Sequence, residues 1–243
     1  MINKVNSSSG LNISMVLDTG SPTANKPATG ISWNEAARFV NFLNASKGYQ
    51  AAYKFSGSGI NDNISLWQSG DAGFDASNAF RNKNAFYFLP SADEWHKAAF
   101  YNPNSASYFR YATSSDSAPS AITSGQLGAV YNHGLGPSDV NQAGSLSPYG
   151  TMAQSGNAWE WEESAFDQIN DSAGENRGLR GGSWEYSASF LYARQSQSPA
   201  LDKSTQGFYD VGFRVAMVPE PSSLSLLLAG GAVLVAGRRR KRD

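Results

Sequence analysis

Two segments of the chain place hydrophobic residues with the period of an amphipathic helix. The first begins at Ser32 with the sequence S-W-N-E, a capping box in which Ser32 and Glu35 bond each other's backbone amides. Hydrophobic residues then recur at helical spacing until Gly48: Trp33, Ala36, Ala37, Val40 and Leu43. This pattern predicts a helix from Trp33 to about Ala45 with one buried face.

The second helical segment follows residues 86–90, a short aromatic stretch that is typical of a strand. A capping box begins again at Ser91 and closes at Glu94. The helix that it starts should end before Pro103, because proline has no backbone N–H to donate. We expect this helix to bury Trp95, Ala98 and Ala99.

The rest of the body shows no sustained period of 2 or 3.6 residues. Residues 1–30 are predicted as loop with an edge strand at 13–17, and residues 102–150 are rich in Gly, Ser, Asn and Ala. Ordered coil is favoured over disorder for 102–150, because this stretch carries aromatic and aliphatic anchors that disordered linkers lack. Short strands are predicted at 179–184, 190–193 and 212–217.

The last 26 residues, 218–243, differ in kind from the body. A polar hinge is followed by an apolar run, residues 224–236, and then by five consecutive basic residues. A helix over 222–237 would be about 24 Å long, shorter than the roughly 30 Å apolar core of a bilayer. It can still cross if the bilayer thins and the arginines reach the headgroups, with the basic end in the cytoplasm. The alternative is a buried helix with a solvated basic tail.

This order of residues resembles the PEP-CTERM sorting signal, which in bacteria is recognised by an exosortase, a membrane transpeptidase. The resemblance implies an exported protein, anchored by a C-terminal transmembrane helix and then carried to the cell surface or extracellular matrix. Residues 1–20 contain no apolar run typical of a signal peptide. Because export requires such a signal, we expect the sequence to be truncated at its N-terminus, with a signal sequence encoded upstream of Met1. The signal residues are Pro219, Glu220, Pro221, Arg238, Arg239 and Arg240.

Composition narrows the chemistry of the body. The 243 residues suffice for one domain of about 200 residues, so we assign 1–217 to one domain and 218–243 to sorting. The net charge is −1, and the last six residues carry five positive charges and one negative, which leaves −5 for the rest. A mildly acidic body argues against nucleic-acid binding. The absence of cysteine excludes disulfides, thiolate metal sites and cysteine nucleophiles.

Five motifs follow one another between residues 30 and 217. They read G-I-S-W-N-E-A-A, F-L-P-S-A-D-E-W-H-K-A-A, Y-G-T-M-A-Q-S-G-N-A-W-E-W, L-R-G-G-S-W and G-F-R-V. In this order they resemble the formylglycine-generating enzyme (sulfatase-modifying factor) family. Its pattern runs roughly V-S-W-x-x-A, R-L-P-T-E-A-E-W-E-x-A-A, G-L-x-D-M-x-G-N-V-W-E-W, R-G-G-S-W and G-F-R. The resemblance implies an α+β fold, a coil-rich variant of the C-type-lectin-like architecture.

The family's copper chemistry is not expected in this chain. Formylglycine-generating enzymes hold copper(I) between two cysteines and oxidise a cysteine of a sulfatase, and copper(I) prefers thiolate ligands. Residues 185–199, where the pair would lie, offer none. Other branches use non-haem iron with histidines from an extra helical domain, whereas this chain has only His96 and His133, with nothing to indicate that they converge.

Calcium is the ion that the resemblance favours. It implies a structural site formed by the backbone carbonyls of Gly156 and Ala158 and the carboxylate of Glu160, which are the hard oxygen ligands that calcium prefers. Asn132 is a candidate ligand of a second site, whereas Ala153 stands where the family has a side-chain ligand. The alternative is that Glu160 pairs with an arginine or accepts backbone amides.

Most of the remaining polar and aromatic residues are predicted to have structural roles. Trp159, Trp161 and Trp184 are predicted as core. Arg180 and Arg214 are expected to pair with buried carboxylates, and Glu162, Glu163 and Asp167 to form a solvated acidic face. The family's active-site wall is replaced here, so a ligand groove is expected to be lined by Trp184, Tyr186, Tyr192 and Arg194.

Together these features predict a surface-sorted protein whose domain is a non-catalytic module that binds an extracellular peptide or polysaccharide. Two alternatives stay open. One is a metal-dependent oxidoreductase of the same family with altered chemistry, and the other is a purely structural envelope component.

Overall fold

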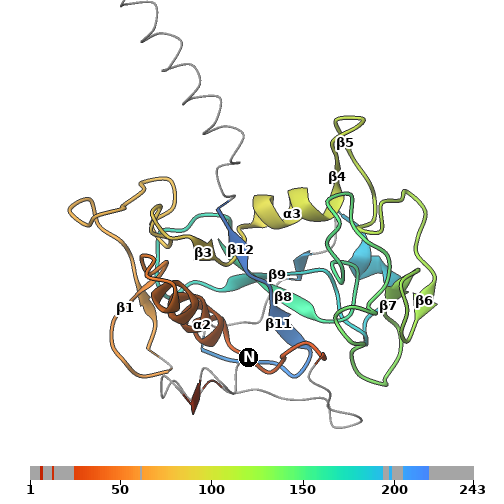
Figure 1. Ribbon diagram of the computed structural model, residues 1–243, viewed down its shortest axis with the longest axis horizontal. Coiled ribbons are helices and arrows are strands. Elements are labelled where there is room, and N and C mark those ends of the chain that lie inside the picture. Colours follow the sequence, from red (N-terminus) through yellow and green to blue (C-terminus); the bar gives the residue numbers. More distant parts are fainter. Residues whose placement is uncertain are drawn as a thin grey trace, which may run out of the picture.

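The structure is a computed structural model of the chain, and it describes residues 6–7, 13, 25–60, 62–193, 197–198 and 205–218. Its two long helices are α2 (Trp33–Ser46) and α3 (Ala92–Phe100) (Figure 1). Both predicted capping boxes are formed. Ser32 Oγ accepts from Glu35 N at 3.2 Å, and Glu35 Oε2 accepts from Ser32 N at 2.8 Å. Ser91 and Glu94 make the same pair of bonds. Both predicted helices are thus confirmed, although Ala98 is only half-buried.

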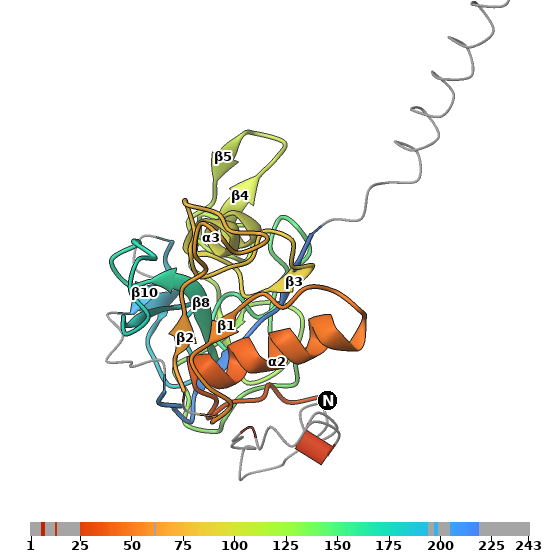
Figure 2. The same ribbon diagram turned by 90° about the vertical axis from the view of Figure 1, so that its left-hand side faces the viewer.

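The centre of the domain is a four-stranded sheet in the order β10-β9-β8-β11. Its strands are β8 (Trp159–Ala165), β9 (Arg177–Arg180), β10 (Gln197–Ser198) and β11 (Val211–Phe213). Neighbours run antiparallel except β8 and β11, which are parallel. Figures 1 and 2 show α2 and α3 on separate sides of this sheet. All seven residues of β8 are buried, so this strand lacks the alternation that would have predicted it.

Four two-stranded ladders order the coil around the sheet. One joins distant segments, since β3 (Tyr87–Phe88) pairs with β12 (Ala216–Met217). A second is local and pairs β1 (Lys54–Phe55) with β2 (Ile64–Ser65). The other two, β4 (Tyr101–Asn102) with β5 (Ser107–Tyr108) and β6 (Ala121–Ile122) with β7 (Ala129–Val130), lie within residues 101–130. The expectation of ordered coil over 102–150 is therefore confirmed.

The main core packs α2 against the central sheet. It includes Trp33, Val40, Trp161 and Leu179, and two smaller clusters gather around Trp95 and around Trp184. The exposed fractions of Trp159, Trp161 and Trp184 are 3%, 0% and 5%, which confirms that these rings are core.

Several predicted elements differ from the structure. The strand expected at 190–193 is wrong: residues 188–191 form the 3₁₀ helix η1 (Ala188–Leu191), which buries Leu191. The strand expected at 212–217 is divided into β11 and β12 by Arg214 and Val215. The strand expected at 179–184 begins earlier and ends at Arg180, because Gly181 and Gly182 have φ of 94° and 77°.

Three predictions fall partly or wholly outside the described residues: the strand at 13–17 apart from buried Ile13, the transmembrane helix, and the sorting signal. In the part of the chain that is described, no helix combines the length and the apolar character needed to cross a membrane.

Candidate functional site

The G-N-A-W-E-W loop joins the other motifs through its backbone. Gly156 has φ of +80°, and a Cβ there would lie 2.1 Å from the carbonyl oxygen of Val130. Gly156 N donates to Gly181 O at 2.7 Å, and Asn157 O accepts from Trp184 N at 3.0 Å. Only glycine fits this approach, so the motif residue is required by the fold itself.

Glu160 lies on β8 opposite Gly212 of β11, and its carboxylate is held by two side chains. Trp95 Nε1 donates to Oε2 at 2.6 Å, while Arg214 donates through Nε to Oε2 and through Nη2 to Oε1. Arg214 Nη2 also donates to Met152 O at 3.2 Å. The predicted pairing of Arg214 with a buried carboxylate is confirmed.

A cavity of about 450 Å³ opens beside this ion pair. Most of its wall is apolar and comes from five separate segments, through Ala28, Phe39, Val140, Met152 and Phe213. Its polar groups are Lys26, Asn157, Glu160 and Arg214. We call it the Arg214 cavity. Ligand pockets are typically mostly apolar, with a volume of about 300–1,000 Å³ and a few placed polar groups.

Two cationic groups of the Arg214 cavity keep unused donors. Lys26 Nζ donates to the carbonyl of Pro137 and has no carboxylate partner among the described residues. Arg214 uses Nε and Nη2, and its Nη1 makes no hydrogen bond within the described part of the chain. With Glu160 as the single carboxylate, the cavity carries a net charge of +1.

Of the predicted calcium ligands, the Glu160 carboxylate is already engaged. Both oxygens of Glu160 accept from a guanidinium, which is the arrangement that the alternative to calcium anticipated. Asn132 has φ of +55°, and its backbone N–H donates to Tyr186 O at 2.9 Å. No group of three or more His, Asp or Glu side chains within the described residues is arranged to hold a metal. An ion at Glu160 would compete with Arg214, so these residues fit a guanidinium better than calcium.

Calcium binding stays a prediction with a direct test. Saturating calcium should raise the melting temperature by mass action if the folded chain binds it. Glu160→Gln should then abolish the rise. An unchanged melting temperature of the wild type would contradict a calcium site at this loop.

The residues predicted to line a ligand groove lie in separate aromatic contacts. Trp184 is buried against Tyr209, with ring centroids 6.1 Å apart. Tyr186 is 43% exposed and packs on Trp159 and Phe190. Tyr192 contacts Tyr111 with centroids 5.8 Å apart, and Arg194 lies outside the described residues. The Arg214 cavity contains none of them.

The prediction that Glu162 and Glu163 form a solvated acidic face is wrong. Both are fully buried, whereas Asp167 is exposed. Glu162 pairs with Arg180, which confirms the second predicted arginine pairing. Glu163 pairs with Arg81. Burial raises the pKa of both carboxyls, and the arginines oppose that rise. Sequence reasoning missed Arg81, because no local pattern links it to β8.

Fold and site together define a coil-rich α+β domain that keeps an apolar cavity beside a buried ion pair and has no thiol ligand. The chain belongs to the family of the sulfatase-modifying factor enzyme 1-like domain, whose family model matches residues 4–218. A PEP-CTERM protein-sorting motif matches residues 218–241. The combination indicates an exported protein that an exosortase-type enzyme sorts to the cell surface.

Three solved structures share the fold at low sequence identity. Treponema denticola variable protein 1 is 21% identical, with a TM-score of 0.57 over 84% of this chain and 75% of that one. The crystal structure of CarF gives 19% identity and a TM-score of 0.59 over 90% and 81%. PvdO from Pseudomonas aeruginosa gives 14% and 0.55 over 90% and 76%. A comparison with curated proteins finds no significant match.

Proposed function

We propose that this chain is a non-catalytic binding module, displayed at the cell surface, whose Arg214 cavity takes the apolar, carboxylate-bearing end of an extracellular peptide. The observation that carries this proposal is the cavity itself, with a mostly apolar wall and unused donors on Lys26 and Arg214. Without cysteine, the chain has no thiolate pair for the family's copper(I) chemistry.

The charge of the cavity selects the class of ligand. An apolar group gains free energy by leaving water for this wall. A single carboxylate would neutralise the net charge of +1 and accept from the unused Nη1 of Arg214, a charge-assisted bond. A cationic ligand would face Lys26 and Arg214 and would be repelled.

The test compares two forms of one peptide. An acetylated peptide that ends in leucine with a free carboxylate should bind the purified full chain, and its C-terminal amide should bind about ten-fold more weakly, since it lacks the charge. Isothermal titration measures both affinities. Equal affinity for the two forms would contradict the proposed recognition of charge.

A matched pair of variants locates the binding. Val140 is 48% exposed and lines the cavity, whereas Val215 is 37% exposed and does not. Val140→Asp should weaken binding of the free-carboxylate peptide because its own carboxylate competes for Lys26 and Arg214, and Val215→Asp should leave binding unchanged. If both variants bind like the wild type, the ligand does not enter this cavity.

A further inference from the structure

A second concave region lies at the start of α3 and shares no residue with the Arg214 cavity. It consists of two hollows of about 280 and 260 Å³ that meet at Ser77, Asn78 and Arg81. We call these hollows together the Arg81 cleft. Their combined size falls in the range of about 300–1,000 Å³ that is typical of ligand sites.

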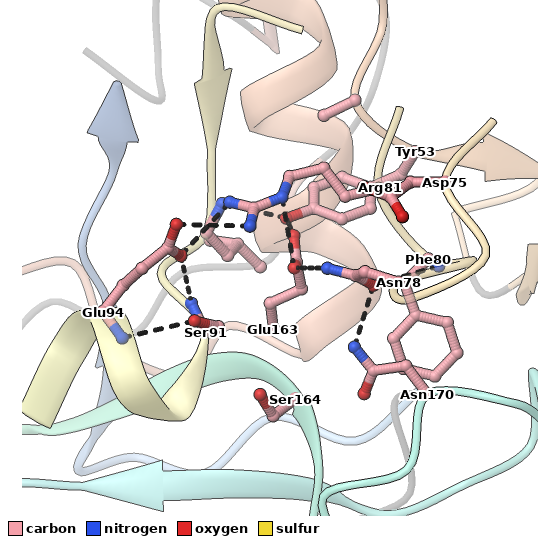
Figure 3. A network of polar contacts seen from close by, with 12 residues as sticks. Tyr53, Asp75, Asn78, Phe80, Arg81, Ser91, Glu94, Glu163, Ser164 and Asn170 are labelled. Atoms are coloured by element: carbon pink, nitrogen blue, oxygen red, sulfur yellow. Dashed lines mark hydrogen bonds and ion pairs between the residues drawn. The ribbon is translucent and has the colours of Figure 1, made fainter. Parts of the chain in front are cut away.

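A buried carboxylate fixes the floor of this cleft. Glu163 Oε2 accepts from Tyr53 OH at 2.8 Å, and Oε1 accepts from Asn78 Nδ2 at 2.5 Å. Arg81 Nε lies 3.4 Å from Oε1, and the other two guanidinium nitrogens donate to Glu94 at 3.2 Å each. Figure 3 shows Arg81 between the two glutamates. The positive charge of Arg81 is therefore already balanced by these two carboxylates.

The amide of Asn78 is held in one orientation. While its Nδ2 donates to Glu163, its Oδ1 accepts from Asn170 Nδ2 at 2.9 Å (Figure 3). Asn170 Oδ1 in turn accepts from Ala165 N at 2.8 Å. The wall of the cleft is preorganised by these bonds, which reduces the cost of ordering it around a ligand.

The smaller hollow is lined by polar side chains alone, and several keep hydrogen-bonding capacity. Asp93 is exposed and makes no hydrogen bond or ion pair within the described residues. The side-chain amide of Gln168 donates through Nε2 to Ala165 O and Phe166 O, and its Oε1 is left to accept. Ser91 and Ser164 each accept a backbone N–H, which leaves their hydroxyl protons to donate. The hollow therefore offers both free donors and free acceptors within one small space.

We infer that the Arg81 cleft binds a neutral carbohydrate. A sugar hydroxyl donates and accepts at once, so neighbouring hydroxyls can donate to Asp93 and Gln168 while they accept from Ser91 and Ser164. Anions are disfavoured, because Asp75, Asp93, Glu94 and Glu163 outnumber Arg81 and Lys83. An apolar ligand would leave these polar groups without partners. This site goes beyond the proposed peptide binding and does not depend on it.

The test uses neutral oligosaccharides of two linkages, maltotetraose and cellotetraose, at millimolar concentration with the full chain. We expect at least one of them to shift the side-chain amide signals of Asn78, Gln168 and Asn170 in nuclear magnetic resonance spectra. Asp93→Ala should weaken that binding about ten-fold, because it removes a hydrogen bond to a charged group. Lys97→Ala, one turn further along α3 and outside the cleft, is the control and should bind like the wild type.

A second variant and a charged probe separate the outcomes. Gln168→Ala alters an exposed loop residue and should weaken binding without changing the melting temperature. The inference is overturned if neither neutral sugar shifts these amides, or if only the amine-bearing chitosan tetramer does, which would make the cleft a cation site. Sugar-induced shifts confined to Tyr186 and Tyr192 would contradict sugar binding in the Arg81 cleft, but they would leave the proposal of a binding module in place.

Discussion

At the scale of single residues, the molecule is organised by three buried glutamates on one strand. Glu160, Glu162 and Glu163 each pair with an arginine from a different segment: Arg214, Arg180 and Arg81. A buried charge is tolerated only when it is paired and hydrogen-bonded. These pairs therefore specify which segments lie against β8.

Removing one partner of such a pair should be costly. We predict that Glu160→Ala lowers the free energy of unfolding by about 3 kcal/mol, since it leaves the Arg214 guanidinium half-buried without its counter-charge. Denaturant titration measures the loss. Glu185→Ala, which removes only an exposed contact with Tyr209, is the control and should cost under about 1 kcal/mol. Equal losses in the two variants would contradict the structural role of Glu160.

At the scale of elements, the helix caps were readable from the sequence because they are local. A capping box lies within four consecutive residues, so Ser32 and Ser91 could be assigned without knowing the fold. Strand β8 could not be predicted from the sequence, because it is buried on both faces and its glutamates are of a residue type that usually lies on the surface. Their arginine partners are separated from them by long stretches of chain, and spacing alone does not connect them.

A cap variant tests the helix assignment. Ser32→Ala should lower the free energy of unfolding by about 1 kcal/mol, because the backbone N–H of Glu35 loses its acceptor. Ser58→Ala, at an exposed loop position, should change it by less than about 0.5 kcal/mol. A loss at Ser32 no larger than the one at Ser58 would show that this cap does not stabilise α2.

The loop between β8 and β9 should respond to pH through Glu175. Burial, together with neighbouring Asp171 and Asp167, raises the pKa of Glu175 to about 7. The folded state therefore binds the proton of the Glu175 carboxyl more tightly than the unfolded state does. The stability that this protonated carboxyl contributes is present below about pH 4.5 and is lost as pH rises through about 7. Glu175→Gln should reduce the fall in melting temperature between pH 5 and pH 8. A fall as large as in the wild type would contradict this assignment.

At the scale of the whole molecule, the chain combines a sulfatase-modifying-factor-type domain with a sorting motif. The motifs predicted the family through their order, and the structure gives a physical reason for one motif residue, the close approach of Gly156 to Val130. They did not predict the Arg214 cavity or the Arg81 cleft, since each is assembled from side chains of several segments that lie far apart in the sequence. The predicted groove residues, by contrast, are divided among separate aromatic contacts.

The sorting motif has its own test in the producing bacterium. Replacing Pro219, Glu220 and Pro221 with alanine should block recognition by the exosortase-type enzyme, so the unprocessed chain should accumulate in the membrane fraction. Immunoblotting of surface and membrane fractions measures this, with Ser222→Ala as the control. Normal surface delivery of the triple variant would contradict sorting through this motif.

The central claim is that this scaffold binds a ligand and does not convert it. The most direct measurement titrates the leucine-terminated peptide into the full chain and records the mass of the recovered peptide by mass spectrometry. The account predicts saturable binding that Val140→Asp weakens and a peptide of unchanged mass. Absence of binding, or a change in peptide mass that requires the wild-type chain, would contradict it.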